Sequence, residues 1–328
     1  MRRATFRTLT LVVAGLLVAV AAVYQWGYSA YRAPGPAAAD VTVVLPKGAS
    51  LDAIARRLAE AGAIVRPAVF AWGARIEGKA RHLKAGEYRV PAGASMREVV
   101  ALVVEGRTVV RKLTVPEGLT AIEIVELVRA TDGLAGALDR VPEEGALLPE
   151  TYHFAFGDER AQLIERMRRA MTQLLAELWP ERQTGLPFRN ERDAVVLASI
   201  VERETPLEAE RARVAAVLIN RLNRGMPLQA DPTVIYTVSG GRGSLARPLT
   251  RADLEVESPF NTYRAKGLPP GPIANPGRAS IAAVLRPAAT DELYFVADGS
   301  GGHAFARTLA EHQKNVARWR KLNAEAGK

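Results

Sequence analysis

The stretch Leu197-Ala198-Ser199-Ile200-Val201-Glu202-Arg203-Glu204-Thr205 is predicted to form the end of a partly buried helix. Its apolar residues recur at a spacing of three to four, which is typical of one buried helix face. Pro206 then prevents the helix from simply running on. Two carboxylates therefore lie at a helix end, where the chain must turn.

These two glutamates are expected to differ. At about 100° per residue, Glu202 and Glu204 point to nearly opposite faces of the helix. Glu204 continues the apolar stripe, so burial should raise its pKa, and a raised pKa suits a general acid. The alternative is that both acids are surface ion-pair partners of Arg203, Arg211 and Arg213. This window by itself leaves both interpretations open.

The composition is that of a globular protein with 328 residues, enough for one large domain or two ordinary ones. No cysteine is present, so disulfides and thiolate metal sites are excluded. The net charge of +9 favours anionic surfaces such as lipid headgroups or an acidic polymer. Nucleic acid is not an expected partner, because the basic residues are scattered among acids and no nucleic-acid motif accompanies them.

The N-terminus carries an uncharged run from Leu9 to Val23, preceded by three arginines and followed by three aromatic residues. Residues 9–28 number about twenty, enough to cross the hydrocarbon core of a bilayer. This order favours a retained anchor with a cytoplasmic N-terminus; a cleaved signal peptide is the alternative. Residues 1–28 are thus predicted to form a cytoplasmic tip and transmembrane helix, and residues 29–40 a Pro/Gly/Ala-rich linker.

One pattern then occurs three times: a β-rich run, Pro, Gly and a hydroxyl residue before an amphipathic helix. The copies are Leu45-Pro46-Lys47-Gly48-Ala49-Ser50, Val90-Pro91-Ala92-Gly93-Ala94-Ser95 and Val115-Pro116-Glu117-Gly118-Leu119-Thr120. Gly permits the turn and the hydroxyl residue caps the helix, with strands expected at residues 41–45, 87–90 and 109–115. The pattern is either a generic packing unit or a relative of the LysM module, a small glycan-binding fold that it resembles. Residues 41–110 are therefore predicted to form a LysM-like α/β subdomain.

Residues 111–328 are predicted to form a larger mixed α+β domain, which makes the whole chain α+β. Helices are expected over residues 120–130, 160–178, 208–222 and from about 308 to 321, and a strand over residues 293–297. Ser280 is expected to cap a helix that ends at Leu285. The Pro/Gly-dense segment 258–277 is expected to be a long ordered loop, and such loops often carry function.

Several polar residues near the glutamate pair are candidates for ligand contact. A buried Asn220 must hydrogen-bond either to backbone, as a structural clamp, or to a ligand. Gln229 and Tyr236 can bond sugar hydroxyls or stack on a sugar ring. Asp231 has a structural explanation as the N-cap of a helix that starts at Pro232. His303 either belongs to a site or caps a turn.

The motifs that would indicate other chemistry are missing. The four histidines are too dispersed for a metal site such as HExxH, and the sequence has no nucleophile elbow, P-loop or dinucleotide fingerprint. Neither metal nor cofactor is therefore expected. What remains is a carboxylate-centred site bordered by Asn, Gln, Tyr and Thr, the usual chemistry for cleaving a glycosidic bond. A hydrolase would normally need a second carboxylate, and Glu202 is badly directed for that role.

Several segments in a fixed order resemble the endolytic murein transglycosylases of the MltG/YceG type. They are Ala198-Ser-Ile-Val-Glu-Arg-Glu-Thr205, Val217-Leu-Ile-Asn-Arg-Leu222, Leu228-Gln-Ala-Asp-Pro-Thr-Val-Ile-Tyr236, Asn261-Thr-Tyr263 through Gly267-Leu-Pro-Pro-Gly271, Tyr294-Phe-Val-Ala-Asp298 and Gly301-Gly-His-Ala-Phe305. The resemblance covers nearly the whole chain after the anchor. It departs at Glu150, where the family often has Asp, and at Arg203, where Lys is common.

The resemblance implies one inner-membrane helix, a LysM-like subdomain and a periplasmic catalytic domain that cuts glycan strands internally. Glu204 would protonate the glycosidic oxygen between N-acetylmuramic acid and N-acetylglucosamine, and as carboxylate would then help the muramyl C6 hydroxyl close a 1,6-anhydro ring. The expected substrate contacts, all polar residues of the resembling segments, are Glu202, Asn220, Gln229, Thr233, Tyr236, Asn261 and Tyr263. Peptidoglycan strands are the implied partner, and penicillin-binding proteins are implied by the family only. The alternatives are a noncatalytic glycan-binding scaffold and a true hydrolase.

Overall fold

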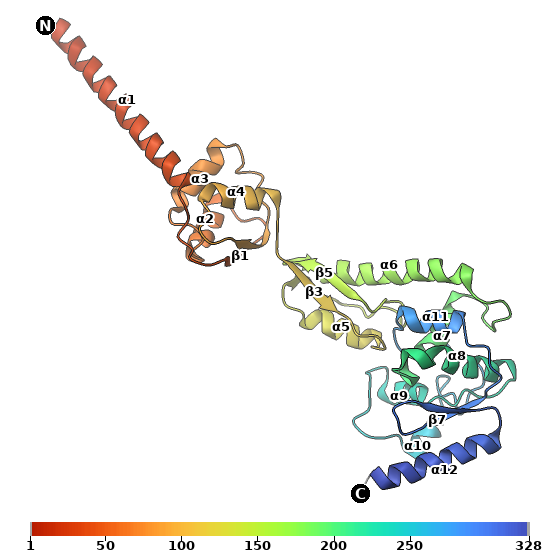
Figure 1. The fold of residues 1–328 in the computed structure, drawn as a ribbon. Helices are drawn as coiled ribbons and strands as arrows, with labels where there is room; N and C mark the ends of the chain where they lie inside the picture. Colours follow the sequence, from red (N-terminus) through yellow and green to blue (C-terminus); the bar gives the residue numbers. More distant parts are fainter. Residues whose placement is uncertain (1, 327–328) are drawn as a thin grey trace. The chain divides into compact units, whose positions relative to one another are not determined.

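The computed structural model describes the backbone of residues 2–326 and the side chains of residues 9–325. Met1, Gly327 and Lys328, which the predicted anchor and catalytic domain include, lie outside the described residues, as do the side chains of the first three arginines. Contacts divide the chain into two units: residues 1–111 with 153–158, and residues 112–152 with 159–328. Helices and two-stranded sheets are mixed throughout, which confirms the α+β class (Figure 1).

The first unit begins with α1 (Arg2–Arg32), a single long helix (Figure 1). Its segment Leu9–Arg32 has a mean hydropathy of 2.0 over its most apolar window, and no residue of that window is buried. It therefore fits a single-pass membrane anchor by length and composition. The helix continues to Arg32, into the segment predicted as linker, because Tyr31 packs in the core of the unit and is only 2% exposed. The Tyr31 ring lies over Gly73, where an added Cβ would come within 2.4 Å of the ring.

A two-stranded antiparallel sheet and three helices complete this unit. In the sheet, β1 (Val41–Leu45) pairs with β2 (Gly86–Val90), with Val41 opposite Val90. The helices are α2 (Leu51–Glu60), α3 (Pro67–Ile76) and α4 (Met96–Glu105). They bury a shared apolar core that includes Leu58, Phe70, Tyr88, Val99 and Val103.

The three repeated segments fold in the predicted way. Ser50 caps α2 by accepting a hydrogen bond from the Ala53 amide, at 3.2 Å. Ser95 and Thr120 each form a complete capping box with the glutamate three residues later, at the starts of α4 and α5 (Ala121–Ala130). The turn glycines of the three copies have φ values of 76°, 67° and 78°, a left-handed conformation that glycine adopts without strain. The strand-turn-helix reading is confirmed, whereas LysM-like character stays a prediction.

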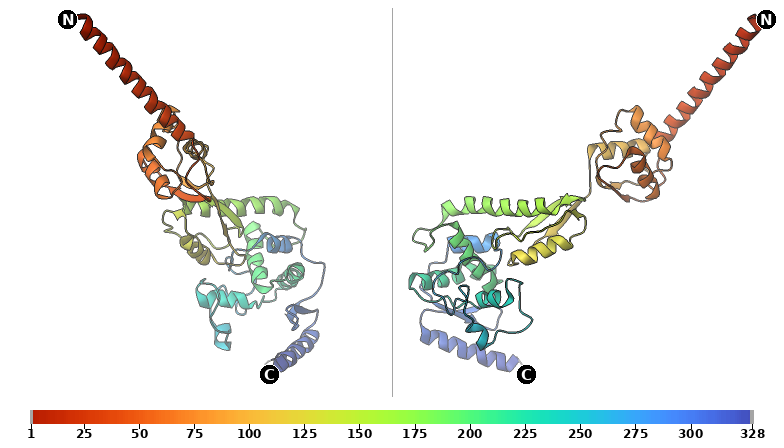
Figure 2. Two further views of the ribbon diagram at one scale, coloured as in Figure 1. Left: turned by 60° about the vertical axis from the view of Figure 1, so that its left-hand side comes forward. Right: turned by 180° about the vertical axis from the view of Figure 1, so that it is seen from behind.

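Two further short sheets follow in the chain. One pairs β3 (Val110–Thr114) with β5 (Thr151–Ala155), and the other pairs β4 (Leu134–Ala135) with β6 (Asp158–Glu159). The next helix, α6 (Arg160–Leu178), has the predicted bounds and is unbroken in both views of Figure 2. It ends in a 3-10 turn over Trp179–Glu181, where Pro180 stops regular helix.

The core of the second unit is built from three helices that contact one another: α7 (Glu191–Glu204), α8 (Glu208–Asn223) and α11 (Arg278–Leu285). Their buried side chains include Leu197, Ile200, Leu218, Ile281 and Val284. The prediction that Ser280 caps α11 was wrong, because the helix starts at Arg278 after Gly277. Ser280 is fully buried inside the helix.

The rest of this unit surrounds that core. Two short helices, α9 (Asp231–Ser239) and α10 (Arg251–Leu254), precede the long loop. At the C-terminal end, β7 (Tyr294–Ala297) and β8 (His303–Ala306) form an antiparallel hairpin. The last helix, α12 (Leu309–Ala326), packs on both strands (Figure 1).

Candidate active site

The helix α7 is held in place at its start and at Ser199, in the turn before its end. Asn190 caps its start by accepting a hydrogen bond from the Asp193 amide, at 3.0 Å. Further along, the buried Ser199 hydroxyl accepts a hydrogen bond from the Ile273 amide, also at 3.0 Å, and so attaches the long loop to the helix. The helix ends at Glu204, and Thr205 is extended. The last glutamate thus occupies a rigid position, as catalytic groups require.

Glu204 opens into a cavity of about 390 Å³ within the second unit. The lining residues come from four helices, the β7–β8 hairpin and three loop positions. They are Glu204, Arg221, Leu228, Gln229, Asp231, Tyr263, Phe295, Val296, Ala297, His303 and His312. Most are polar or aromatic, which suits a ligand with many hydroxyl groups.

The Glu204 carboxyl has a pKa raised from 4.5 to about 8. Desolvation by the surrounding protein is the largest cause, the Asp231 carboxylate adds to it, and the Arg221 guanidinium opposes it. Within the part of the chain that the structure describes, the carboxyl of Glu204 has no hydrogen-bond partner. At neutral pH this group therefore holds a proton that is free to be donated into the cavity.

Asp231 is a residue of this cavity that the sequence interpretation placed wrongly. It was expected to be an N-cap, but α9 begins at Asp231 itself, Ala230 precedes it as the cap position, and no side chain caps the helix. The helix start is set by the contact between the Ala230 amide and the Thr262 hydroxyl, at 2.9 Å. The Asp231 carboxylate instead accepts a hydrogen bond from the Tyr263 hydroxyl at 2.5 Å.

Three of the predicted site residues come together here: Glu204, Gln229 and Tyr263. Gln229 is the only non-glycine residue with positive φ in the described chain, at 50°. The backbone N–H of Gln229 donates to the Thr262 carbonyl at 3.1 Å, which holds this uncommon conformation in place. Its side chain is thereby directed to the cavity wall beside Arg221.

Three other predicted residues satisfy the protein's own backbone. Asn220 donates to the carbonyls of Thr290 and Glu292, at 2.8 and 3.0 Å. Of the two alternatives for this residue, the structure therefore shows the structural clamp. Asn261 is fully buried and donates to two carbonyls at the end of α10 and just after it. Thr233 is fully buried and bonds the Ala230 carbonyl. None of the three lines the cavity.

Glu202 and Tyr236 also lie away from the cavity. The Glu202 side chain is only 5% exposed. Its carboxylate accepts a hydrogen bond from Arg211 at 3.1 Å and another from the Gly277 amide at 2.9 Å. It is thus half of a buried ion pair that attaches α7 to α8 and to the start of α11. The Tyr236 hydroxyl donates to Glu144 at 3.4 Å.

Two basic residues of the cavity carried no prediction, Arg221 and His312. Arg221 is 9% exposed, and its guanidinium donates to the carbonyls of Leu293 and Leu228, at 2.7 and 2.8 Å. Its spacing from Val217 and Leu218 places it on the apolar stripe of α8, a signal for a buried charge. His312 stacks on Tyr294 with ring centroids 5.1 Å apart, and burial lowers its pKa. No local motif distinguishes it on the polar α12.

His303 faces the same cavity and contacts Glu210, with Nδ1 2.7 Å from one carboxylate oxygen. The backbone amide of His303 donates to the other oxygen at 2.9 Å. Of the two alternatives that the sequence left open, the structure thus favours the first, because His303 lines the same cavity as Glu204. No group of three His, Asp or Glu side chains in the described chain is arranged to hold a metal ion.

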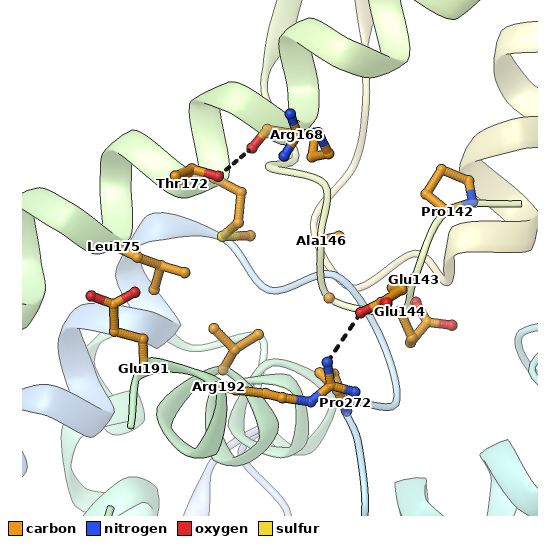
Figure 3. Close-up of a pocket in the computed structure, with 13 residues that line it drawn as sticks. Pro142, Glu143, Glu144, Ala146, Arg168, Thr172, Leu175, Glu191, Arg192 and Pro272 are labelled. Atoms are coloured by element: carbon orange, nitrogen blue, oxygen red, sulfur yellow. Dashed lines mark hydrogen bonds and ion pairs between the residues drawn. The ribbon is translucent and has the colours of Figure 1, made fainter. Parts of the chain in front are cut away.

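A larger pocket of about 540 Å³ lies elsewhere in the second unit, between α6, α7 and the segment around Glu143 (Figure 3). Glu143 is paired there with Arg192 at 3.1 Å. Burial raises the pKa of the neighbouring Glu144 to about 7, but its carboxylate accepts hydrogen bonds from the Ala121 amide and Asn275, at 2.8 and 3.0 Å. The carboxylates of Glu143 and Glu144 are thus already bonded to the protein, and the smaller cavity has the stronger chemical case.

Fold and cavity together define a candidate general-acid enzyme built on a helix end. A model of the YceG-like family matches residues 43–318, and the chain belongs to that family. The resemblance read from the sequence motifs is thereby confirmed.

The similar proteins agree with this assignment. An endolytic murein transglycosylase of Bacillus subtilis is 30% identical over 305 residues, covering 84% of this chain and 83% of the relative. One from Streptococcus pneumoniae is 28% identical, and this chain spans 58% of its length. The crystal structure of a yceG-like protein from Listeria monocytogenes is 31% identical with a TM-score of 0.52, covering 84% of this chain and 98% of that one.

Proposed function

We propose that this chain is a membrane-anchored endolytic lytic transglycosylase. It cleaves the glycosidic bond between N-acetylmuramic acid and N-acetylglucosamine within peptidoglycan strands and leaves a 1,6-anhydro-muramyl end. The relatives named endolytic murein transglycosylases support the substrate class. The observation that carries the proposal is the single desolvated carboxyl of Glu204, protonated at neutral pH inside a polar cavity.

The chemistry starts with proton transfer. Glu204 donates its proton to the glycosidic oxygen, the bond from that oxygen to the muramyl C1 breaks, and an oxocarbenium-like centre forms at C1. The C6 hydroxyl of the same sugar then attacks C1 and loses its proton, and Glu204 as carboxylate is able to accept it. The Asp231 carboxylate, which raises the pKa of Glu204, keeps it protonated before the reaction and basic after it. No water is consumed.

Substrate contacts are proposed for the polar residues of the cavity wall. Gln229 and Tyr263 line it, and Tyr263 is oriented by Asp231. Phe295 supplies an aromatic surface on which a sugar ring can stack. We propose no direct contact for Asn220, Thr233 and Asn261, because their donors are bonded to backbone. Glu202 and Tyr236 would act by holding the cavity's supporting helices.

The location follows from α1. A single apolar helix with arginines before it and aromatic residues after it supports an inner-membrane anchor, a cytoplasmic N-terminus and a periplasmic catalytic unit. The net charge of +9 supports contact with anionic lipid and with the acidic peptides of peptidoglycan. Association with penicillin-binding proteins rests on the family resemblance alone, and glycan binding by residues 41–110 on the LysM-like pattern alone.

The test is digestion of purified glycan strands by the full chain, followed by mass spectrometry of the new ends in ¹⁸O-labelled water. Anhydro-muramyl ends without ¹⁸O are expected from the wild type and none from Glu204→Gln. Glu165→Gln, an exposed residue of α6 paired with Arg168, is the matched control and should digest normally. Reducing ends that carry ¹⁸O would instead identify a hydrolase.

Binding of strands without any new ends, in wild type and Glu204→Gln alike, would identify a noncatalytic scaffold. Full activity of Glu204→Gln would also reject the proposed role of this carboxyl. Each of the three readings thus gives a different mass spectrum.

A further inference from the structure

We infer that His303 is a second catalytic residue, positioned by Glu210, which accepts the proton of the muramyl C6 hydroxyl. This inference rests on the proposed function and changes one step of it. Glu204 keeps the role of the acid, and the base becomes the imidazole of His303, at the start of β8 in the lining of the same cavity.

The first support is the arrangement of Glu210 around His303. Both carboxylate oxygens are used: Oε1 accepts from the His303 amide at 2.9 Å, and Oε2 lies 2.7 Å from Nδ1. The side chains are only 14% and 18% exposed. A residue held at its backbone and at its ring by one carboxylate has a fixed ring orientation. This is the geometry of a base that is itself oriented by a third group.

The second support is the tautomer that this contact selects. A carboxylate only accepts hydrogen bonds, so Nδ1 carries the hydrogen. The lone pair then lies on Nε2, which has no hydrogen-bond partner in the described chain. His303 lines the cavity of Glu204, and Phe295 and Phe305 contact its ring edge-on, at centroid distances of 5.2 and 6.2 Å. The free nitrogen is thus available to a ligand in the cavity.

The third support is the connection between this pair and the helix end that bears Glu204. Thr205 directly follows Glu204. Its hydroxyl donates at 3.4 Å to Glu210 Oε2, the oxygen that also contacts Nδ1 of His303. Thr205 is 1% exposed. Gly302 lets the hairpin backbone approach, because an added Cβ there would meet Glu210 Oε1 at 2.8 Å. The acid and the imidazole are therefore held by one connected set of contacts.

The charged and titratable groups that face this cavity come from every element around it. They are His303, Glu204, Arg221, Asp231, Tyr263 and His312, and Glu210 contacts His303 behind this lining. The proton balance uses two of them. Glu204 gives its proton to the departing oxygen, the C6 oxygen bonds to C1, and its proton moves to Nε2 of His303. The imidazolium, stabilised by Glu210, then returns a proton to the Glu204 carboxylate, so both groups are restored and no co-reactant is needed.

The experiment separates the acid from the base by changing the leaving group. Full-length variants are assayed on glycan strands and on a p-nitrophenyl β-glycoside at the muramyl end of a short GlcNAc–MurNAc oligomer. Nitrophenolate departs without a proton, so only the base is needed there. His303→Gln should lower kcat about 100-fold on both substrates with KM within about threefold. Glu204→Gln should be inactive on strands and recover to within about tenfold of wild type on the nitrophenyl substrate.

Two further variants serve as a second test of the His303 role and as a control. Glu210→Gln keeps the shape but allows its amide to donate to Nδ1, which moves the lone pair off Nε2; kcat should fall at least about 10-fold with KM and melting temperature unchanged. This variant decides the question if His303→Gln does not fold. His153→Gln, at an exposed histidine of β5 that lies outside residues 41–110, is the matched control and should behave as wild type.

The inference fails if His303→Gln, or Glu210→Gln in its place, keeps kcat within about threefold of wild type on both substrates. It also fails if Glu204→Gln is inactive on both, because one carboxyl then does both jobs. Either result leaves the proposed function intact, whereas a wild type that forms no anhydro ends removes the function itself.

Discussion

Glu204 and Glu144 are two partly buried glutamates of the same unit, and desolvation raises the pKa of both, to about 8 and about 7. They differ in what surrounds the oxygens. Glu144 accepts from the Ala121 amide, Asn275 and Tyr236, so the protein supplies its hydrogen bonds. Glu204 has no such partner in the described chain and faces a cavity.

The difference shows that a raised pKa by itself does not identify a catalytic acid. Burial disfavours the charged form in either case. A carboxyl whose oxygens are bonded to its own protein holds elements together. A carboxyl without partners in its own protein keeps its oxygens available to hydrogen-bond a ligand that enters the cavity. The pocket that contains Glu144 is the larger one, so size does not decide the matter either.

The largest expected effect is the loss of activity in Glu204→Gln. General acid catalysis contributes about 10²–10⁴-fold, so digestion of glycan strands should fall by at least about 100-fold. Glu144→Gln should keep more than about a third of wild-type activity, because its amide can still accept from Ala121 and Asn275 and bond Tyr236. Rates of anhydro-end formation measure both. Equal losses of activity in Glu204→Gln and Glu144→Gln would contradict the conclusion that only Glu204 takes part in the reaction.

The next effect is on stability and its pH dependence. The folded-state pKa of Glu144, about 7, lies above the ordinary 4.5, so the folded state holds this proton more tightly. The free energy of unfolding therefore falls as pH rises from about 4.5 to about 7 and is level above that. Glu144→Gln removes this fall and should stabilise the protein above pH 7 by up to about 3 kcal/mol, with little change near pH 4. Urea unfolding at the two pH values checks this, and equal stability of both proteins at pH 8 would contradict it.

Glu202→Ala tests the third carboxyl, two residues from Glu204. It leaves Arg211, 11% exposed, with only the Glu117 contact, so the free energy of unfolding should fall by about 2 kcal/mol. Glu165→Ala, which breaks an exposed pair, should leave the free energy of unfolding close to that of the wild type. Urea unfolding gives both numbers. A variant with wild-type stability and a raised KM would instead make Glu202 the substrate contact that the sequence predicted.

The smallest effect is a shift of the pH profile in Asp231→Asn. The Asp231 carboxylate raises the pKa of Glu204, so removing its charge lowers that pKa. Activity needs protonated Glu204 and is lost as pH rises through its pKa, so the basic limb of the kcat/KM profile should move down by about one pH unit. Tyr263→Phe removes the hydrogen bond but keeps the charge, and its limb should stay in place. An unmoved limb in Asp231→Asn would show that desolvation alone sets the pKa of Glu204.

Local structure was predictable to a large extent. The capped strand-turn-helix repeats, the helix that ends at Glu204 and the bounds of α6 follow from residues close together in the chain. So does the separation of Glu202 from Glu204, because helix geometry fixes it. Two of the errors lie where a distant contact sets the boundary: Tyr31 extends α1, and Thr262 moves the start of α9 to Asp231. The third is the start of α11, which lies at Arg278 and not after Ser280.

The site was predictable only in part. Glu204 follows from its place on an apolar stripe, and the cavity confirms that Gln229 and Tyr263 lie beside it. Asn220 and Asn261 are as able as those two to hydrogen-bond a ligand, yet their side-chain amides donate to backbone carbonyls instead. The sequence pattern does not show that these carbonyls lie close to them. Arg221, Asp231 and His312 enter the cavity through helices whose mutual placement no motif encodes.

The sequence by itself determined the elements and the family, and it predicted Glu204 as the acid, because hydrophobic period, capping and motif order are properties of neighbouring residues. Only the tertiary structure decided which polar side chains stay free. That depends on whether a distant carbonyl or amide reaches them first, and it is why Glu144 is bonded within the protein while Glu204, with His303 nearby, faces an open cavity.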